Sequence, residues 1–367
     1  MKPASGIVAR IHAMWQHKGP ASTALLPLAW ITGLVVRQRR ARPRPAPRSA
    51  PPTVVVGNLV VGGTGKTPVV IAMAHRLRAL GWTPGIVSRG YGVSLGPAPR
   101  TGQGTLDAAE FGDEPALIAR ATGAPIAVHP KRSLAREALA RQFPAVDVVI
   151  SDDGLQHLAM SRDVEIVVQD ARGIGNGRLL PAGPLREPAS KLDEVAFIVE
   201  NGGPFEEGGQ APPRMPDEAE NQHAGAAKPR GNTERPERIG MRLEPTSAEQ
   251  LGSGIRLAWA DWVAHHRDSP MAAVAAIGQP QRFFDTLRAA GLRLQSTVAL
   301  PDHDAYEQSP FTSLGEEIIA ITAKDAVKCA RFADPRVWVV HVEANFSDPS
   351  WLDRLSERLA QAAAQRH

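Results

Sequence analysis

The fold is decided by one stretch, Thr53-Val54-Val55-Val56-Gly57-Asn58-Leu59-Val60-Val61-Gly62-Gly63-Thr64-Gly65-Lys66-Thr67-Pro68. It opens with an apolar, β-branched run, continues through a glycine-rich turn and leads into a helical pattern from Val69 to Leu80. Glycines let the backbone curl so that successive amides point at one anion, and the positive end of the helix faces the same anion. The order of strand, loop and helix therefore predicts a phosphate-binding loop in an α/β fold.

This loop offers backbone amides, an ammonium group and a hydroxyl group as ligands. The expected nucleotide-binding residues are Val60, Val61, Gly62, Gly63, Thr64, Gly65, Lys66 and Thr67. The ammonium group of Lys66 adds a point charge, and the hydroxyl of Thr67 is a ligand for Mg²⁺. Val60 stands where the common G-x-x-x-x-G-K-[ST] pattern has its first glycine. An ordinary tight turn between a strand and a helix is the alternative interpretation.

Composition bounds the class of protein. A chain of 367 residues is long enough for two domains with hydrophobic cores. The single cysteine, Cys329, excludes an internal disulfide framework and fits a reducing, cytosolic setting. Residues 1–50 carry nine Lys and Arg and no acidic residue, so the net charge of +4 divides into +9 for this segment and −5 for the rest. The basic end predicts that this segment binds an anionic surface. The rest of the chain contains no nucleic-acid motif, so neither a nucleic acid nor a protein is predicted as a partner.

The apolar residues 22–36 precede six arginines, Arg37, Arg39, Arg40, Arg42, Arg44 and Arg48. Fifteen residues are too few for a spanning helix, which needs about 20. The pattern favours an interfacial helix, with its apolar face in lipid and its arginines on anionic head groups. A helix packed on the protein body is the alternative.

A second strong signal begins with the apolar strand 146–150, which ends at Asp152 and Asp153. A carboxylate at a strand end, downstream of a phosphate-binding loop, is placed to reach Mg²⁺. A turn formed by Asp-Asp-Gly is the alternative. Residues 202–238 contain few large apolar side chains, and their composition predicts a disordered insertion. Short strands are expected within 239–260, followed by a second α/β unit to residue 350 and a terminal helix over 351–367.

The motifs resemble those of one family, tetraacyldisaccharide 4'-kinase, the lipid A 4'-kinase of Gram-negative bacteria. The matching segments are Val56–Pro68, Ser88–Gly92, Gly112–Pro115, Asp152–His157, Leu179–Glu187, Pro280–Phe284, Asp302-His303 with Tyr306, and Lys324–Lys328. They follow the family's order over nearly the whole chain. The loop of this family commonly lacks the first glycine of the G-x-x-x-x-G-K-[ST] pattern, so Val60 at that position agrees with the resemblance. Ala323 stands where the family more often has glutamate, and Gln279 where it often has asparagine.

The resemblance implies a P-loop NTPase-type α/β/α kinase core over residues 51–201, with a second, smaller α/β domain over 239–350 and a membrane-interfacial helix over 1–50. The implied reaction transfers the ATP γ-phosphoryl group to the 4'-hydroxyl of a tetraacylated glucosamine disaccharide 1-phosphate, giving lipid IVA. The implied location is the cytoplasmic face of the bacterial inner membrane, with peripheral or monotopic attachment to an anionic lipid surface.

The resemblance also implies roles for single residues. Asp113 is the expected base, oriented by His303, and Lys66 is the third expected catalytic residue. Thr67 and a carboxylate among Asp152, Asp153 and Glu187 are expected to hold Mg²⁺. Candidates for contact with substrate or phosphate are Arg89, Tyr91, Glu114, Arg132, His157 and Arg186.

Two other classes of protein fit parts of the sequence. A switch-type P-loop GTPase or metallochaperone would read guanine with an Asn/Thr-Lys-x-Asp motif, which Thr322-Ala323-Lys324-Asp325 superficially resembles. A membrane-bound module that binds ATP without catalysis is the other alternative. Neither class accounts for Asp113 together with His303.

Overall fold

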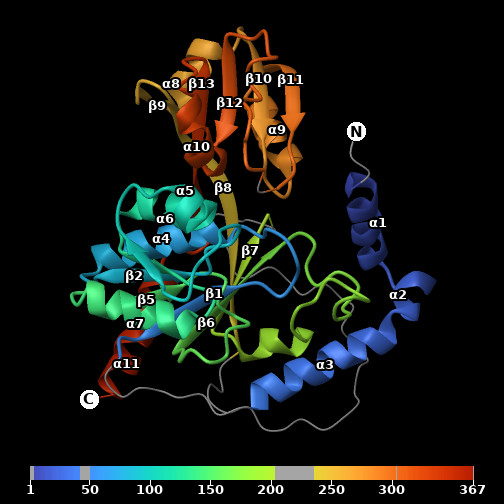
Figure 1. Ribbon diagram of the computed structural model, residues 1–367, viewed down its shortest axis with the longest axis vertical. Coiled ribbons are helices and arrows are strands. Elements are labelled where there is room, and N and C mark those ends of the chain that lie inside the picture. The colour runs from blue at the N-terminus through green and yellow to red at the C-terminus, as the bar shows by residue number, and fades with distance from the viewer. Residues whose placement is uncertain (1–3, 42–49, 203–234, 303, 367) are drawn as a thin grey trace. The chain divides into compact units, whose positions relative to one another are not determined.

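The computed structural model describes residues 4–41, 50–202, 235–302 and 304–366 (Figure 1). The chain forms two compact units. Unit 1 comprises Met1–Lys66, Asp153–Arg242 and Asn345–His367, and unit 2 comprises Thr67–Asp152 and Leu243–Ala344. Most of the predicted insertion, residues 203–234, lies outside the described residues.

Unit 1 is built on a parallel sheet. Its strands, in spatial order, are β1 (Thr53–Gly57), β6 (Val164–Asp170), β7 (Phe197–Asn201) and the start of β8 (Glu237–Gln250). Every residue of β1 is buried, as expected for a β-branched run in a parallel sheet covered on both faces. The parallel register, in which Val56 pairs with Ile166 and Ile166 with Phe197, brings the carboxyl ends of these strands to one edge. Within 239–260, where short strands were expected, most residues belong to the long β8, which pairs with β7 over 237–241 and with a short strand, Arg256–Ala258, over 247–249.

The C-terminal helix belongs to unit 1. Helix α11 (Trp351–Ala364) lays Trp351 against Phe197, with ring centroids 5.3 Å apart. Arg358 covers the same phenylalanine ring and pairs with Glu237 at 2.9 Å. The predicted terminal helix is therefore present, and its apolar side covers the sheet of unit 1.

Three helices at the N-terminus also belong to unit 1: α1 (Ala4–Gln16), α2 (Pro20–Ala24) and α3 (Leu26–Ala41) (Figure 1). The indole of Trp15 donates to the carbonyl of Pro181 at 3.0 Å, and Ser22 donates to that of Ala182 at 2.6 Å. Ser22, Ala29 and Val36 are all buried, and they are spaced by seven residues, which is about two helical turns. One side of this segment therefore packs on the protein. No helix in the described part of the chain is long and apolar enough to cross a membrane.

Four strands of unit 2 lie side by side and continue the predicted α/β alternation. Their spatial order is β3 (Arg100–Gly102), β4 (Ile126–Val128), β2 (Pro84–Ser88) and β5 (Val148–Ser151), with only β3 antiparallel. The associated helices are α4 (Lys66–Ala79), α5 (Ala108–Phe111), α6 (Asp113–Thr122) and α7 (Arg132–Gln142).

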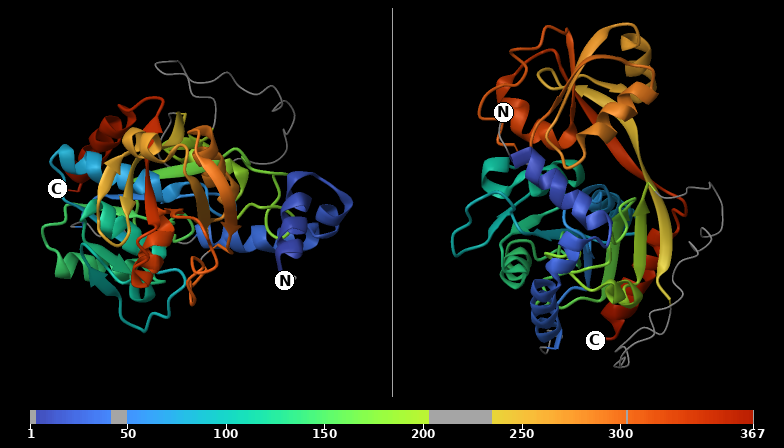
Figure 2. Two further views of the ribbon diagram at one scale, coloured as in Figure 1. Left: turned by 90° about the horizontal axis from the view of Figure 1, so that it is seen from above. Right: turned by 90° about the vertical axis from the view of Figure 1, so that its right-hand side faces the viewer.

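A second group of neighbouring strands in unit 2, all parallel, consists of β11 (Arg293–Ala299), β10 (Pro270–Ala275), β12 (Ile318–Thr322) and β13 (Val337–Phe346) (Figure 2). Helices α8 (Trp259–His266) and α9 (Pro280–Ala289) contribute to the core on one face, and α10 (Ala323–Cys329) to the core on the other. Along β10, Met271 and Ala273 point into the first core, and Ala272 and Val274 into the second. Short β9 (Arg256–Ala258) pairs with β8.

Candidate active site

The glycine-rich loop follows β1, as predicted, and ends at Lys66, the first residue of α4. Gly65 has φ +95°, and a Cβ there would lie 2.5 Å from the Asn201 side chain, so only glycine fits this turn. The ammonium group of Lys66 lies 3.4 Å from Oδ1 of Asp153. The loop thus places a lysine and an aspartate from the two predicted motifs side by side.

The carbonyls of this loop are held by side chains. Arg186 donates to Val60 at 3.3 Å, Asn58 to Gly62 at 2.9 Å, and Asn201 to Thr64 at 3.0 Å. Arg172 donates to two further carbonyls, of Val61 at 3.2 Å and of Gly63 at 2.7 Å. Sequence reasoning singled out none of Asn58, Arg172 and Asn201 for a role. The available signal was position, because all three follow or end parallel strands on the edge where ligands bind.

The amides of the loop divide into two groups. The amide of Val61 donates to the carbonyl of Pro184 at 3.0 Å, and Val60 bridges to Leu185, so these two predicted residues are committed to the neighbouring loop. The amides of Gly62, Gly63, Thr64 and Gly65 have no acceptor within the described residues. The hydroxyl of Thr64 is buried and has no hydrogen-bond partner there either. Gly62 to Gly65 therefore present a group of donors that suits an anion.

Asp153 and Arg186 come together beside this loop. Nη1 of Arg186 lies 3.3 Å from Oδ2 of Asp153, and the guanidinium group also contacts the side chains of Asn58 and Gln156. Asp153 has φ +46°, a conformation that few residues other than glycine, asparagine and aspartate adopt at low cost. The Asp-Asp-Gly segment thus forms a turn, which was the alternative interpretation, and this turn directs the Asp153 carboxylate to two cations, Lys66 and Arg186. Binding of Mg²⁺ by this carboxylate stays a prediction.

Asp152 has different surroundings. Its side chain is buried and accepts a hydrogen bond from Ser88 at 3.0 Å. Arg132 is also buried, and its guanidinium donates to the carbonyls of Asp152 at 3.0 Å and His129 at 3.1 Å. These bonds make Arg132 a brace between the ends of β4 and β5.

Glu187 is buried among charged groups. Burial raises the pKa of Glu187, and the positive charges of Arg40 and Lys191 act in the opposite direction. No group of three or more His, Cys, Asp and Glu side chains in the described ranges is arranged to hold a metal ion. Glu187 and Asp153 thus have different charged neighbours in the structure.

Asp113 and Glu114 open α6. Gly112 has φ +92°, and a Cβ there would lie 2.8 Å from the carbonyl oxygen of Tyr91, so glycine allows the Gly-Asp-Glu segment to approach the Arg-Gly-Tyr-Gly segment. Oδ2 of Asp113 lies 3.0 Å from Nζ of Lys328, and Oε1 of Glu114 lies 3.3 Å from Nζ of Lys324.

The same two lysines reach the segment that contains position 303. Lys324 pairs with Asp302 at 3.3 Å, and Lys328 donates to the carbonyl of Asp304 at 2.7 Å. His303 itself lies outside the described residues. The neighbours of position 303 on both sides are therefore linked to the carboxylates that open α6.

The remaining predicted residues are placed as follows. Arg89 and Tyr91 are exposed after β2, with Tyr91 58% accessible, and His157 is half-buried in the turn after Asp153. Thr67 is the second residue of α4.

The GTPase interpretation does not agree with the surroundings of Asp325. That carboxylate is fully buried, and it binds the hydroxyl of Thr322 at 2.6 Å and the amide of Ala276 at 3.2 Å. Burial raises the pKa of Asp325. Thr322 and Asp325 therefore cap α10 and are not presented to a guanine base.

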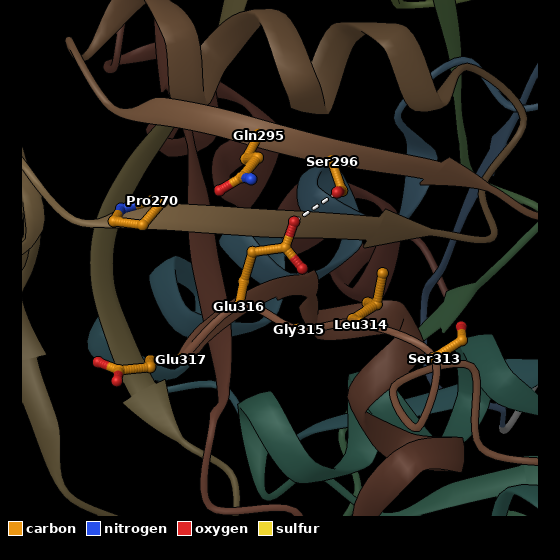
Figure 3. A pocket seen from close by; sticks show the side chains of 8 residues that line it. All are labelled: Pro270, Gln295, Ser296, Ser313, Leu314, Gly315, Glu316 and Glu317. Atoms are coloured by element: carbon orange, nitrogen blue, oxygen red, sulfur yellow. Dashed lines mark hydrogen bonds between the residues drawn. The ribbon is translucent and has the colours of Figure 1, made fainter.

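A cavity of about 530 Å³ lies in unit 2 (Figure 3). It is lined by Pro270, Gln295, Ser296 and residues 313–317, and Glu316 hydrogen-bonds to Ser296 within it. None of the predicted site residues lines this cavity.

The fold and the loop after β1 define an α/β protein with a P-loop at the carboxyl end of a parallel sheet. A family model described as tetraacyldisaccharide-1-P 4'-kinase matches residues 21–360. The chain therefore belongs to the tetraacyldisaccharide-1-P 4'-kinase family. It is a kinase that phosphorylates the 4'-hydroxyl of a tetraacyldisaccharide 1-phosphate, a lipid disaccharide. This confirms the resemblance found in the sequence motifs.

Relatives with the same description agree over almost their whole length. The tetraacyldisaccharide 4'-kinase of Bordetella parapertussis is 55% identical, covering 95% of this chain and 96% of the relative. That of Shewanella baltica is 40% identical, covering 98% and 97%. The crystal structure of LpxK from Aquifex aeolicus in complex with ATP matches with a TM-score of 0.69 at 23% identity, covering 93% of this chain and 99% of that one. This structural likeness confirms the α/β fold.

Proposed function

We propose that the amides of Gly62 to Gly65, with the ammonium group of Lys66, bind the β- and γ-phosphates of ATP. The observation that carries the proposal is the arrangement of this loop: side chains hold its carbonyls, while these amides have no acceptor in the described residues. The negative charge of ATP would take Lys66 from its present partner, Asp153.

Mg²⁺ fits the oxygen ligands that this site offers. We assign it to Thr67, Asp152 and Asp153, because a hydroxyl and carboxylates are the hard donors that this ion prefers. Asp153 already faces two cationic groups, so it lies where positive charge is stabilised. When bound, the ion neutralises charge on the β- and γ-phosphate oxygens. Glu187 is the weaker candidate, since burial raises the pKa of its carboxyl group and so disfavours the ionised form that would bind the ion.

Asp113 is the proposed base. The 4'-hydroxyl oxygen of the disaccharide attacks the γ-phosphorus, the bond from that phosphorus to the β–γ bridging oxygen breaks, and ADP leaves. The hydroxyl proton passes to the Asp113 carboxylate, which Lys328 holds at 3.0 Å. His303 is retained as its proposed partner, because Asp302 and Asp304 contact the two lysines that hold Asp113 and Glu114.

The acceptor carries acyl chains, and α3 offers a surface that fits a lipid bilayer. Six large apolar side chains on this helix are exposed, and the four most exposed are Leu28 (52%), Trp30 (84%), Ile31 (59%) and Leu34 (64%). Arginines follow them at Arg37 and Arg39. We propose that this helix lies in the interface of an anionic membrane, which the resemblance identifies as the cytoplasmic face of the bacterial inner membrane.

The proposal is tested with ATP and the disaccharide 1-phosphate, with the product identified by its mass. Lys66→Ala and Asp113→Asn are expected to lower turnover by at least about 100-fold while the melting temperature stays within a few degrees. Lys66→Ala is also expected to weaken ADP binding, whereas Asp113→Asn is expected to leave it unchanged. Full turnover by Asp113→Asn would remove Asp113 as the base, and full turnover by Lys66→Ala would remove the phosphate assignment.

A further inference from the structure

The side chain of Arg172 is held rigidly just beyond the end of β6. Its Nε donates to both carboxylate oxygens of Asp170, at 2.9 and 3.0 Å. The Asp170 side chain is 1% exposed, and it also accepts the backbone amide of Arg172 at 3.1 Å. A buried carboxylate with three such bonds orients the guanidinium group before any ligand binds.

The other end of the guanidinium group binds the phosphate loop. Nη1 donates to the carbonyl of Val61 at 3.2 Å, and Nη2 donates to that of Gly63 at 2.7 Å. A Cβ on the intervening Gly62 would lie 3.1 Å from Nη1, and Gly62 has φ +98°. Residues 61–63 of the loop therefore pack closely around the planar guanidinium group of Arg172, which donates two hydrogen bonds to them.

These two bonds determine where the neighbouring amides point. The carbonyl and the N–H of a trans peptide point in opposite directions, and the one cis peptide of the described chain is Leu180–Pro181. When Arg172 holds the carbonyls of Val61 and Gly63, it turns the amides of Gly62 and Thr64 away from itself. Those amides belong to the group without acceptors in the described residues.

We infer that Arg172 is a positioning residue that sets the amides of the loop for the phosphates of the nucleotide. The inference rests on the proposed function of this loop. Arg172 acts through backbone carbonyls, so the loop does not have to reorganise when phosphate arrives, which is the condition for strong electrostatic stabilisation. Lysine cannot replace it fully, because an ammonium group lacks the planar fork that reaches two carbonyls at once.

The test measures ADP affinity by calorimetry and steady-state constants for the full-length protein. Arg172→Gln is expected to raise the ADP dissociation constant and the KM for ATP by about 10- to 100-fold, since two charge-assisted hydrogen bonds are lost. The KM for the disaccharide is expected to stay within about twofold, and the melting temperature within a few degrees. For Arg172→Lys, the ADP dissociation constant is expected to lie between the values of the wild type and of Arg172→Gln.

Asp170→Asn tests the same guanidinium group through the residue that orients it. It keeps the shape of the side chain but weakens the hold on Nε, so ADP affinity is expected to fall less than in Arg172→Gln. Because both residues act as a unit, the double variant is expected to bind ADP no more weakly than Arg172→Gln alone. Arg238→Lys, at an exposed ion pair with Glu200, is the matched control and is expected to bind ADP like the wild type.

The outcomes separate this inference from the proposed function. If Lys66→Ala weakens ADP binding but Arg172→Gln and Arg172→Lys do not, the inference is overturned and the phosphate site stands. If none of the three variants changes ADP affinity, the phosphate site itself is wrong. If Arg172→Gln raises the KM for both substrates equally, its effect is a general structural one and the inference is also overturned.

Discussion

Nζ of Lys328 lies 3.0 Å from Oδ2 of Asp113, although 215 positions separate the two residues in the chain. A second pair of the same kind joins Lys324 to Glu114. The two lysines are one turn apart on α10, and the two acids are adjacent in the first turn of α6. Asp113 and Lys328 are both largely buried, with side chains 14% and 9% exposed, so this pair is less screened than one at the surface.

Removing the cation beside Asp113 is expected to slow the reaction. In Lys328→Met the carboxylate keeps its place on α6 but loses the group that holds it at 3.0 Å. We expect turnover to fall by about 10-fold or more, with the KM for ATP changed little, because correct placement of a base contributes to the chemical step. Steady-state kinetics measure both constants. Lys131→Met, at an exposed lysine, is the control, and unchanged turnover in Lys328→Met would contradict the role.

The exposed apolar side of α3 is expected to bind membranes. Trp30→Glu places a charge where the structure has an 84% exposed indole, and it should reduce sedimentation with anionic phospholipid vesicles several-fold. Ile255→Glu is the matched control, because Ile255 is an exposed apolar residue elsewhere, at 55%. Equal binding by Trp30→Glu and the wild type would exclude this helix as the membrane contact. Binding of the wild type should also weaken as salt rises, since the arginines are screened.

The segment between β7 and β8 is expected to tolerate shortening. These strands are parallel neighbours, with Phe197 opposite Glu237, so the chain must cross from one end of the sheet to the other. Such a connection needs about a dozen residues. Deleting residues 209–228 leaves more than that between Asn201 and Glu237, and we expect turnover to stay within about twofold of the wild type. A large loss of activity would show that the deleted residues contribute to folding or catalysis.

The thiol of Cys329 is expected to be unreactive in the folded protein. Burial raises the pKa of Cys329 to about 12, and the negative charge of Asp325 acts in the same direction. The folded thiol therefore stays protonated at pH 8, whereas an unfolded cysteine begins to ionise near pH 8.5. The group should lower stability as pH rises above about 9 toward 12, because only the unfolded state loses the proton readily. A thiol reagent should react within minutes only after denaturation, and rapid native labelling at pH 8 would contradict this.

Several features could be predicted because they depend on neighbours in the sequence. The run of β-branched residues before Gly57 predicted β1, and the glycines up to Gly65 predicted the loop that leads into α4. The carboxylates of Asp152 and Asp153 were expected just after an apolar strand, and they follow β5 there. The apolar stretch at 22–36 predicted a helix, and α3 begins at Leu26.

Other features could not be predicted because their partners are far away in the chain. Arg172 has no motif that marks it, and its contacts with the glycine-rich loop depend on β6 ending next to β1, the strand that leads into this loop. Asn201 reaches the loop because β7 lies beside β6. The guanidinium of Arg132 is buried against two carbonyls that no sequence pattern indicated, and its contact with phosphate stays a prediction.

The sequence by itself determined the family, the kinase activity and the location of the glycine-rich loop, because these depend on local strings of residues. Only the tertiary structure decided which side chains orient that loop and which cation accompanies Asp113. The physical reason is that a hydrogen bond or an ion pair depends on distance in space, and parallel strands and helix packing set those distances between residues more than 100 positions apart.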